Sequence, residues 1–125
     1  MPRMTKREFE EIVRQALDEL PPQFKDALNN LDVQVRWAPT AWERRRWRLR
    51  PGSELFGIYT GVPLTRRSHG YSMALPDTIL IFQRTHERHC ASQSQMVEQA
   101  RQTLLHEIGH YMGIDENRLR ELGVG

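Results

Sequence analysis

Two histidines, His106 and His110, lie four residues apart, and Glu107 follows the first of them directly. On an α-helix, residues at this spacing lie on the same face, one turn apart. Their two imidazoles can therefore bind one metal ion at about 2 Å, the usual Zn–N distance. Glu107 is rotated away from this pair and can instead accept a proton from a water molecule held by the ion. The spacing predicts a metal centre built on a helix.

The residues after the second histidine can complete such a centre. Gly113 can adopt a positive φ and so end the helix. The chain can then turn back and present an acidic side chain, either Asp115 or Glu116, as a third ligand. Two histidines, one carboxylate and an open fourth position are typical of a catalytic zinc site. The alternative is a surface helix that carries these residues by coincidence.

A long amphipathic helix is expected to position the histidines. Ser92 or Ser94 can cap its start, and the apolar residues that follow recur at helical spacing. On a helical wheel this apolar stripe lies about half a turn from His106, so both histidines should face solvent or a cleft. The stripe comprises Met96, Val97, Ala100, Leu104, Leu105, Ile108 and Met112.

The remaining patterns predict an α+β fold. Thr5 and Glu8 form a capping box before an amphipathic helix over residues 6–20, and a short second helix begins at Pro22. Alternating or apolar stretches predict strands at 33–38, 55–59 and 78–83. We expect N-terminal helices, a small mixed sheet and the long metal-binding helix packed on one face of it. Residues 1–125 are predicted to form a single domain.

Composition restricts the possible classes of protein. The net charge is only +2, which argues against nucleic-acid binding as the main function. A single cysteine, Cys90, excludes an intramolecular disulfide and suits a reducing compartment. No stretch of 18 apolar residues is present, so we expect no membrane span and a soluble, cytoplasmic protein.

Two further clusters could carry chemistry of their own. Segment 42–50 is rich in arginine and contains two tryptophans, a composition that could bind nucleic acid. We interpret it instead as a strand or surface loop that is solvated or faces a partner, given the mild net charge. His86, His89 and Cys90 could bind zinc, but on an irregular connector they lack defined geometry, and an exposed linker is favoured.

Three blocks of the sequence carry a resemblance to a known family. They are residues 57–65, residues 75–81 and residues 105–116, the last of which reads H-E-x-x-H-x-x-G-x-x-E. In these blocks the chain resembles the small zincin-like metallopeptidases of bacteria, short single-domain proteins with a minimal gluzincin-like core. The metzincins differ, since they carry a third histidine and a methionine turn that this chain lacks.

The resemblance implies a zincin-like fold with one Zn²⁺ on His106 and His110, and Glu107 as the general base. It places an acidic third ligand three residues after the glycine, which is Glu116 here. The family more often has aspartate at that position, so Asp115 stays an alternative third ligand.

The predicted function is therefore that of a zinc metallopeptidase, a hydrolase that cuts peptide bonds with a metal-activated water and Glu107. Its substrate would be a peptide or an unfolded protein, with no membrane or nucleic-acid partner. Tyr71 and Tyr111 are candidates for stabilising the oxyanion, and the strand at 78–83 is the expected sheet edge for the substrate. The alternative is a catalytically weak zinc-containing binding module that uses segment 42–50 to bind a partner.

Overall fold

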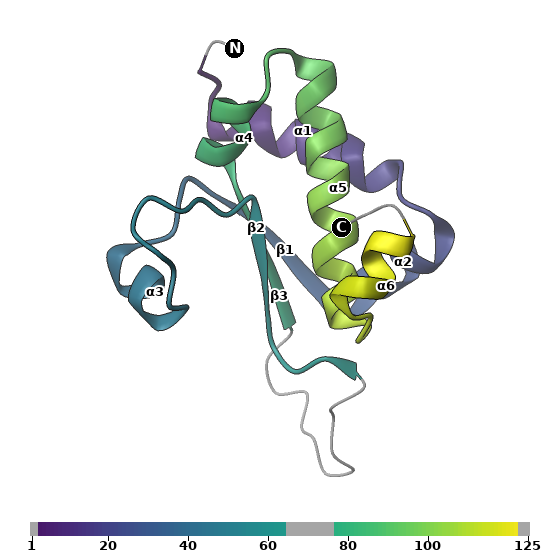
Figure 1. Ribbon diagram of the computed structural model, residues 1–125. Helices are drawn as coiled ribbons and strands as arrows, with labels where there is room; N and C mark the ends of the chain where they lie inside the picture. The colour runs from purple at the N-terminus through teal and green to yellow at the C-terminus, as the bar shows by residue number, and fades with distance from the viewer. Residues whose placement is uncertain (1–2, 65–76, 123–125) are drawn as a thin grey trace.

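The computed structural model describes residues 3–64 and 77–122, which form helices around a small sheet (Figure 1). The N-terminal helices, α1 (Lys6–Asp18) and α2 (Pro22–Ala27), begin where the sequence predicts. Both capping-box hydrogen bonds form at the start of α1, between Thr5 and Glu8. The other elements are the 3₁₀ helix η1 (Leu28–Asn30), β1 (Leu31–Arg36), α3 (Ala41–Arg46), β2 (Gly57–Thr60), β3 (Asp77–Phe82), α4 (Gln83–His89), α5 (Gln93–Tyr111) and α6 (Glu116–Glu121).

The sheet within the described residues is mixed, with strand order β1-β3-β2. β1 runs parallel to β3, and β2 runs antiparallel to it. The predicted α+β fold with a small mixed sheet is confirmed. The expectation that the strand at 78–83 offers a free edge to the substrate is wrong, because β3 is hydrogen-bonded on both sides. Its unbroken apolar sequence is that of a central strand.

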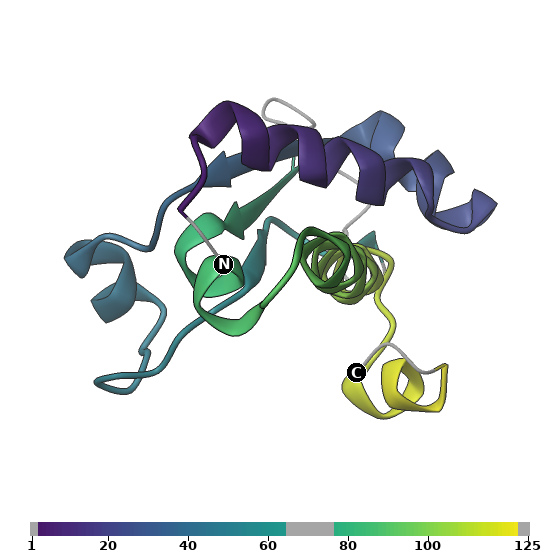
Figure 2. The ribbon, with the colours of Figure 1, turned by 90° about the horizontal axis from the view of Figure 1, so that it is seen from above.

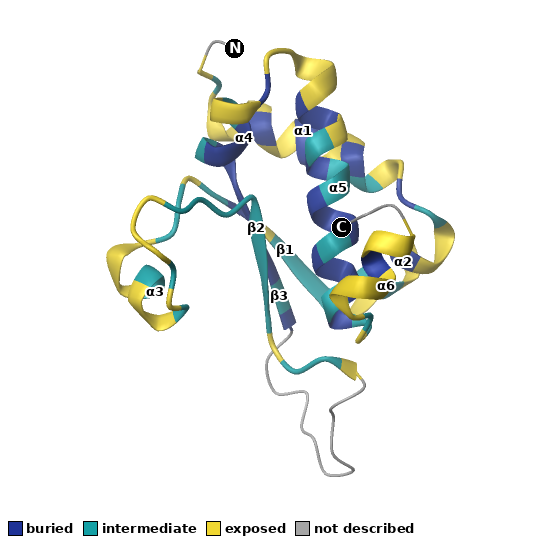
Figure 3. Cartoon of the chain, in the orientation of Figure 1, coloured by how far each residue is buried: buried dark blue, intermediate teal, exposed yellow. Residues whose placement is uncertain are grey.

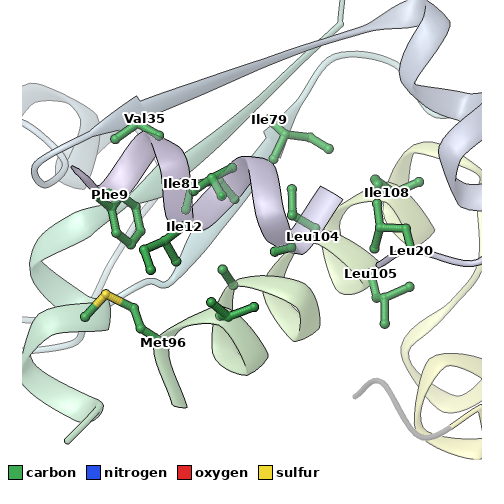
Figure 4. Packing of buried hydrophobic residues seen from close by; sticks show 14 of the residues in the cluster. Phe9, Ile12, Leu20, Val35, Ile79, Ile81, Met96, Leu104, Leu105 and Ile108 are labelled. Carbon is green, nitrogen blue, oxygen red and sulfur yellow. The ribbon is translucent and has the colours of Figure 1, made fainter. Parts of the chain in front are cut away.

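The core lies between one face of the sheet and the two longest helices. Figure 2 shows α5 end-on, with α1 crossing beside it. Side chains from α1, β1, β3 and α5 meet there (Figure 4), among them Phe9, Ile12, Val35, Ile79, Ile81, Met96 and Leu104. The apolar stripe of α5 is buried as predicted from Met96 to Ile108, whereas Met112 follows the helix and is partly buried. Burial of this stripe directs the opposite face of the helix outward (Figure 3).

The arginine-rich segment 42–50 begins in a helix rather than in a strand or loop. Thr40 accepts a hydrogen bond from the Glu43 backbone N–H, and Glu43 accepts one from the Thr40 backbone N–H. This second capping box starts α3 in a sequence that has no apolar stripe. α3 lies away from the core, on the far side of the sheet from α5 (Figure 1).

The cluster at residues 86–90 is neither a metal site nor an exposed linker. It belongs to α4 and the residue that follows α4, and its side chains point in different directions. His86 is fully buried between Phe9 and Phe56, and its Nδ1 lies 2.8 Å from the Phe82 carbonyl oxygen. His89 is exposed, and its Nε2 atom lies 2.7 Å from a carboxylate oxygen of Glu54, whereas Cys90 is buried.

No helix in the described part of the chain is both long and apolar enough to cross a membrane.

Candidate metal centre

α5 presents the two histidines on its outward face. Ser92 caps the helix by accepting a hydrogen bond from the Gln95 backbone N–H, and the helix then continues without a break to Tyr111. The side chains of His106 and His110 are 26% and 34% exposed, so both can be reached from solvent. Their ring centroids lie 4.5 Å apart.

The end of α5 turns the chain back toward the histidines. Gly113 has φ 82°, the left-handed conformation that the sequence predicts at this point. The backbone N–H of Ile114 reaches back to the carbonyl oxygen of Gly109 at 2.9 Å. α6 therefore begins close to the last turn of α5 (Figure 1).

The two acidic residues after this turn have different positions. Asp115 caps α6, because its Oδ1 accepts a hydrogen bond of 2.8 Å from the Arg118 backbone N–H. Glu116 is the first residue of α6, and its Oε1 lies 2.7 Å from His110 Nε2 and 3.2 Å from His106 Nε2. The structure thus brings Glu116 together with both imidazoles and gives the Asp115 carboxylate a separate hydrogen bond.

A glycine inside the motif allows α6 to approach α5 closely. A Cβ atom on Gly109 would lie 2.5 Å from the Cδ2 atom of Leu119, a residue of α6 that is fully buried. Real Cβ atoms do not approach other atoms so closely. The absence of a side chain at Gly109 therefore allows Leu119 to pack on α5, and this packing places α6 and Glu116 beside the histidines.

Glu107 lies on the same turn as His106 but is buried, with only 7% of its surface exposed. The backbone N–H of Tyr59 in β2 donates a hydrogen bond of 2.9 Å to its Oε1 atom. The same oxygen lies 3.3 Å from Nδ1 of His110. Glu107 is thus near the ring nitrogen of His110 that faces away from Glu116, and β2 fixes its carboxylate.

This anchoring hydrogen bond could not be found from the sequence, because it joins residues 48 positions apart. The one local signal is Gly57, since a glycine within a strand often marks the close approach of another segment. A Cβ atom on Gly57 would lie 2.8 Å from Thr103 Cγ2 on α5 and 2.8 Å from the Leu80 carbonyl oxygen.

The carboxylates make this site attractive to positive charge. Hydrogen bonding to Glu107, and then to Glu116, raises the pKa of His110 to about 9. In the same way, hydrogen bonding to His110 lowers the pKa of the Glu116 carboxyl. One ligand atom each from His106, Glu107 and His110 lies within 4.8 Å of the others, a grouping that can hold a metal ion.

A cavity of about 360 Å³ borders His106 and Glu107. The chain before and within β2 forms one wall, and the outward face of α5 forms the other. Tyr111 is not among the residues that line this cavity. It is buried and packs edge-on against Tyr59, and its role in stabilising the oxyanion stays a prediction. Tyr71 lies outside the described residues. The lining residues are Glu54, Leu55, Phe56, Gly57, Gln99, Gln102, Thr103, His106 and Glu107.

Residues 28–125 match the sequence model of the zincin-like metallopeptidases. The chain belongs to the zincin-like metallopeptidase family. This finding confirms the family and the fold class that the sequence predicts. It covers β1, the cavity and the whole of α5 and α6, so the residues described above all lie within the matched region.

A solved structure has a similar fold. The chain is similar to a conserved hypothetical protein from Thermo thermophilus, with a TM-score of 0.58 and 22% sequence identity. The match covers 87% of this chain and 94% of that one. No curated protein matches the sequence.

The residues of this zincin-like chain fit the zinc ion that the family implies. A carboxylate oxygen lies within 3.2 Å of two imidazole Nε2 atoms, and imidazole nitrogens with a carboxylate oxygen are donors that zinc takes in proteins. The bond between Tyr59 N–H and Glu107 is an outer contact of the kind that orients groups beside a metal.

Proposed function

We propose that the protein is a zinc-dependent peptidase in which His106, His110 and Glu116 are the metal ligands and Glu107 is the general base. The main support for this proposal is that one oxygen of the Glu116 carboxylate lies 3.2 Å from Nε2 of His106 and 2.7 Å from Nε2 of His110. Asp115 is not proposed as a ligand, because its carboxylate caps α6.

The two oxygens of Glu107 have separate tasks in this proposal. Oε1 is held by the Tyr59 backbone N–H, whereas Oε2 has no hydrogen-bond partner among the described residues and belongs to a residue that borders the cavity. A zinc ion at this site would supply Lewis acidity, which lowers the pKa of water and polarises a carbonyl group. Glu107 then accepts a proton from the attacking water and returns it to the departing amine.

The edge of β2 is the part of the sheet that can align a peptide beside Glu107. The Phe82 backbone N–H donates to the Phe56 carbonyl, so by alternation the backbone groups of Gly57 and Tyr59 point away from β3. The Tyr59 N–H is used to hold Glu107. The backbone groups of Gly57, at the cavity wall, are left to pair with a peptide. An extended peptide can pair with this edge, as in other cases of strand addition. The substrate we propose is therefore an extended peptide or an unfolded protein segment.

The test compares Glu107→Gln with the wild-type chain on an unfolded protein and a mixed peptide library. We expect hydrolysis to fall by at least ~100-fold, since the general base is lost, while one zinc stays bound because the three ligands are intact. Glu98→Gln is the matched control, as it makes the same change on an exposed residue of α5.

Two results would count against this function. Equal hydrolysis by wild type and Glu107→Gln would remove Glu107 from the chemistry. A wild-type protein that holds one zinc but cuts nothing in the library would favour the alternative, a zinc-containing binding module that uses the arginine-rich α3 region.

A further inference from the structure

The chain from α3 to Ser53 surrounds a surface concavity of about 680 Å³ that is separate from the metal centre. We call it the arginine hollow. α3 itself is mostly exposed (Figure 3) and lies on the far side of the sheet from α5 (Figure 1). The hollow is lined by Ala41, Arg44, Arg45, Arg48, Leu49, Arg50 and Pro51.

The positive charge of this region is not neutralised within the described part of the chain. Arg45, Arg46, Arg48 and Arg50 are all exposed and have no carboxylate partner there. The nearby acid, Glu43, is held by both guanidinium nitrogens of Arg36. Of the nine other arginines among the described residues, five pair with a glutamate, at residues 14, 36, 88, 101 and 118.

Arg44 keeps the hollow in a defined shape. Its two terminal nitrogens donate to the carbonyl oxygens of Ser53, at 2.9 Å, and Arg50, at 2.8 Å. The Ser53 hydroxyl donates to the same Arg50 carbonyl. A loop held in this way is ordered before a ligand arrives, which reduces the entropic cost of binding.

Arg48 adopts a conformation that costs energy for a side chain. Its φ is 56°, and it is the one residue other than glycine with a positive φ among the described residues. It follows the end of α3, where glycine is the usual and less strained choice. An arginine at this position is difficult to explain by folding alone, and residues held in such conformations gather at binding sites.

The arginine hollow and the cavity beside Glu107 are lined by neighbouring parts of one chain segment. The chain that leaves it at Pro51 continues through Ser53 to Glu54, Leu55 and Phe56, which line that cavity. Trp42 lies one turn before Arg45 and Arg46 on α3, and its side chain is 63% exposed. Exposed tryptophan together with arginine is the composition of an interaction surface.

We infer that the arginine hollow binds an acidic segment of a polypeptide substrate whose adjoining extended part enters the cavity at Glu107. Unpaired guanidinium groups recognise carboxylates through charge-assisted, bidentate hydrogen bonds. Only the statement that the extended part enters the cavity at Glu107 rests on the proposed peptidase function. A polypeptide is favoured over nucleic acid because the positive charge is local and the whole chain carries only +2.

The test measures binding separately from hydrolysis, using the full chain with Glu107→Gln. The probe is a fluorescent peptide with a run of glutamates beside an uncharged segment, and the comparison probe has lysines in place of the glutamates. We expect binding of the acidic probe alone, and a roughly five- to tenfold higher Kd in Arg45→Gln/Arg48→Gln. Lys25→Gln, which removes one exposed charge on α2, is the control and should leave the Kd unchanged.

Arg48→Gly separates binding from folding. This change removes a guanidinium group and relieves the positive φ, so Tm should not fall while the Kd for the acidic probe rises. In the active wild type, neutralising Arg45 and Arg48 should lower the preference for the acidic over the uncharged substrate, measured as a ratio of kcat/KM.

Three results would overturn the inference. They are equal binding of the acidic and lysine probes, an unchanged Kd in Arg48→Gly, and tighter binding of a single-stranded DNA oligonucleotide that is lost in the same variants. If the wild type proves inactive, the binding measurements still decide whether the hollow recognises acidic chains.

Discussion

At the scale of single residues, the backbone decides which of two adjacent carboxylates can bind a metal. Asp115 precedes α6 in an extended conformation, and its short side chain accepts a hydrogen bond from the Arg118 backbone N–H. Glu116 lies within the helix, and its longer side chain reaches both histidines. From the spacing alone both residues stay candidates, because the choice depends on where α6 starts.

His86 gives the protein a measurable sensitivity to acid. Burial lowers the pKa of His86 to about 4, against about 6.5 for an unfolded chain. The unfolded state therefore takes up a proton first as the pH falls, so the stability that neutral His86 contributes is full above about pH 6.5 and is lost progressively down to pH 4. We expect the contribution of His86 to fall by about 2 kcal/mol between pH 7 and pH 5, measured as the difference between wild type and His86→Gln in urea unfolding at each pH.

The matched variants are His86→Gln and His89→Gln. His86→Gln should flatten this pH dependence, because its amide can still donate to the Phe82 carbonyl but does not titrate there. His89→Gln changes an exposed ring on the same helix. The charge of His89 is the last of the causes that lower the pKa of His86, so this variant should reduce the pH dependence only slightly. A steep loss of stability that persists in His86→Gln would assign the effect to other groups.

At the scale of elements, α6 holds the third proposed ligand and depends on α5 for its position. We predict that Gly109→Ala displaces Leu119, and Glu116 with it, because the added Cβ would lie 2.5 Å from Leu119 Cδ2. The Kd for zinc should rise roughly tenfold, measured by competition with a coloured chelator.

Gly109→Ala/Leu119→Val provides the control for this effect. Valine lacks the Cδ atoms that the new methyl group meets, so the double variant should recover most of the zinc affinity. If Gly109→Ala binds zinc as tightly as wild type, then α6 adapts to the methyl group without moving Glu116.

Elements with a strong apolar pattern could be predicted, and those without one could not. The stripes of α1 and α5 determine their buried faces, and the four-residue spacing of His106 and His110 is itself local. The sequence of α3 does contain a local signal for the start of a helix, the Thr40 and Glu43 capping box. α4 carries none: its sequence is polar, and His86 is buried only because Phe9 and Phe56 enclose it. The strand order, and hence the role of β2 at Glu107, depends on distant contacts.

At the scale of the whole molecule, zinc should link the C-terminal elements to the stability of the fold. Zinc at about 100 times its Kd adds about 2.7 kcal/mol to the free energy of unfolding, which raises Tm by roughly 8 to 12 °C for a chain of this length. The measurement is a thermal scan with and without a chelator, together with the zinc content of the purified chain.

His106→Ala should lose both the bound zinc and this rise in Tm. His86→Ala, although less stable, should keep one zinc, because the ring nitrogens of His86 contact the Phe82 carbonyl and the Thr103 hydroxyl rather than the proposed ligands. A wild-type chain that binds no added zinc would contradict the proposed metal centre as a whole.

The segment that connects β1 to β2 has a further consequence for protein engineering. Its two ends are held by the start of α4, since Arg84 N–H donates to the Trp37 carbonyl and the Thr85 hydroxyl donates to the Leu55 carbonyl. Between these two hydrogen bonds, the Trp47 ring packs on Phe82 of β3 and so joins the segment to the sheet. Residues 38–53 can therefore be exchanged as a unit if Trp47 is kept together with Glu43, which pairs with Arg36 of β1. Grafting other sequences there should change which chains the protein binds without altering its core.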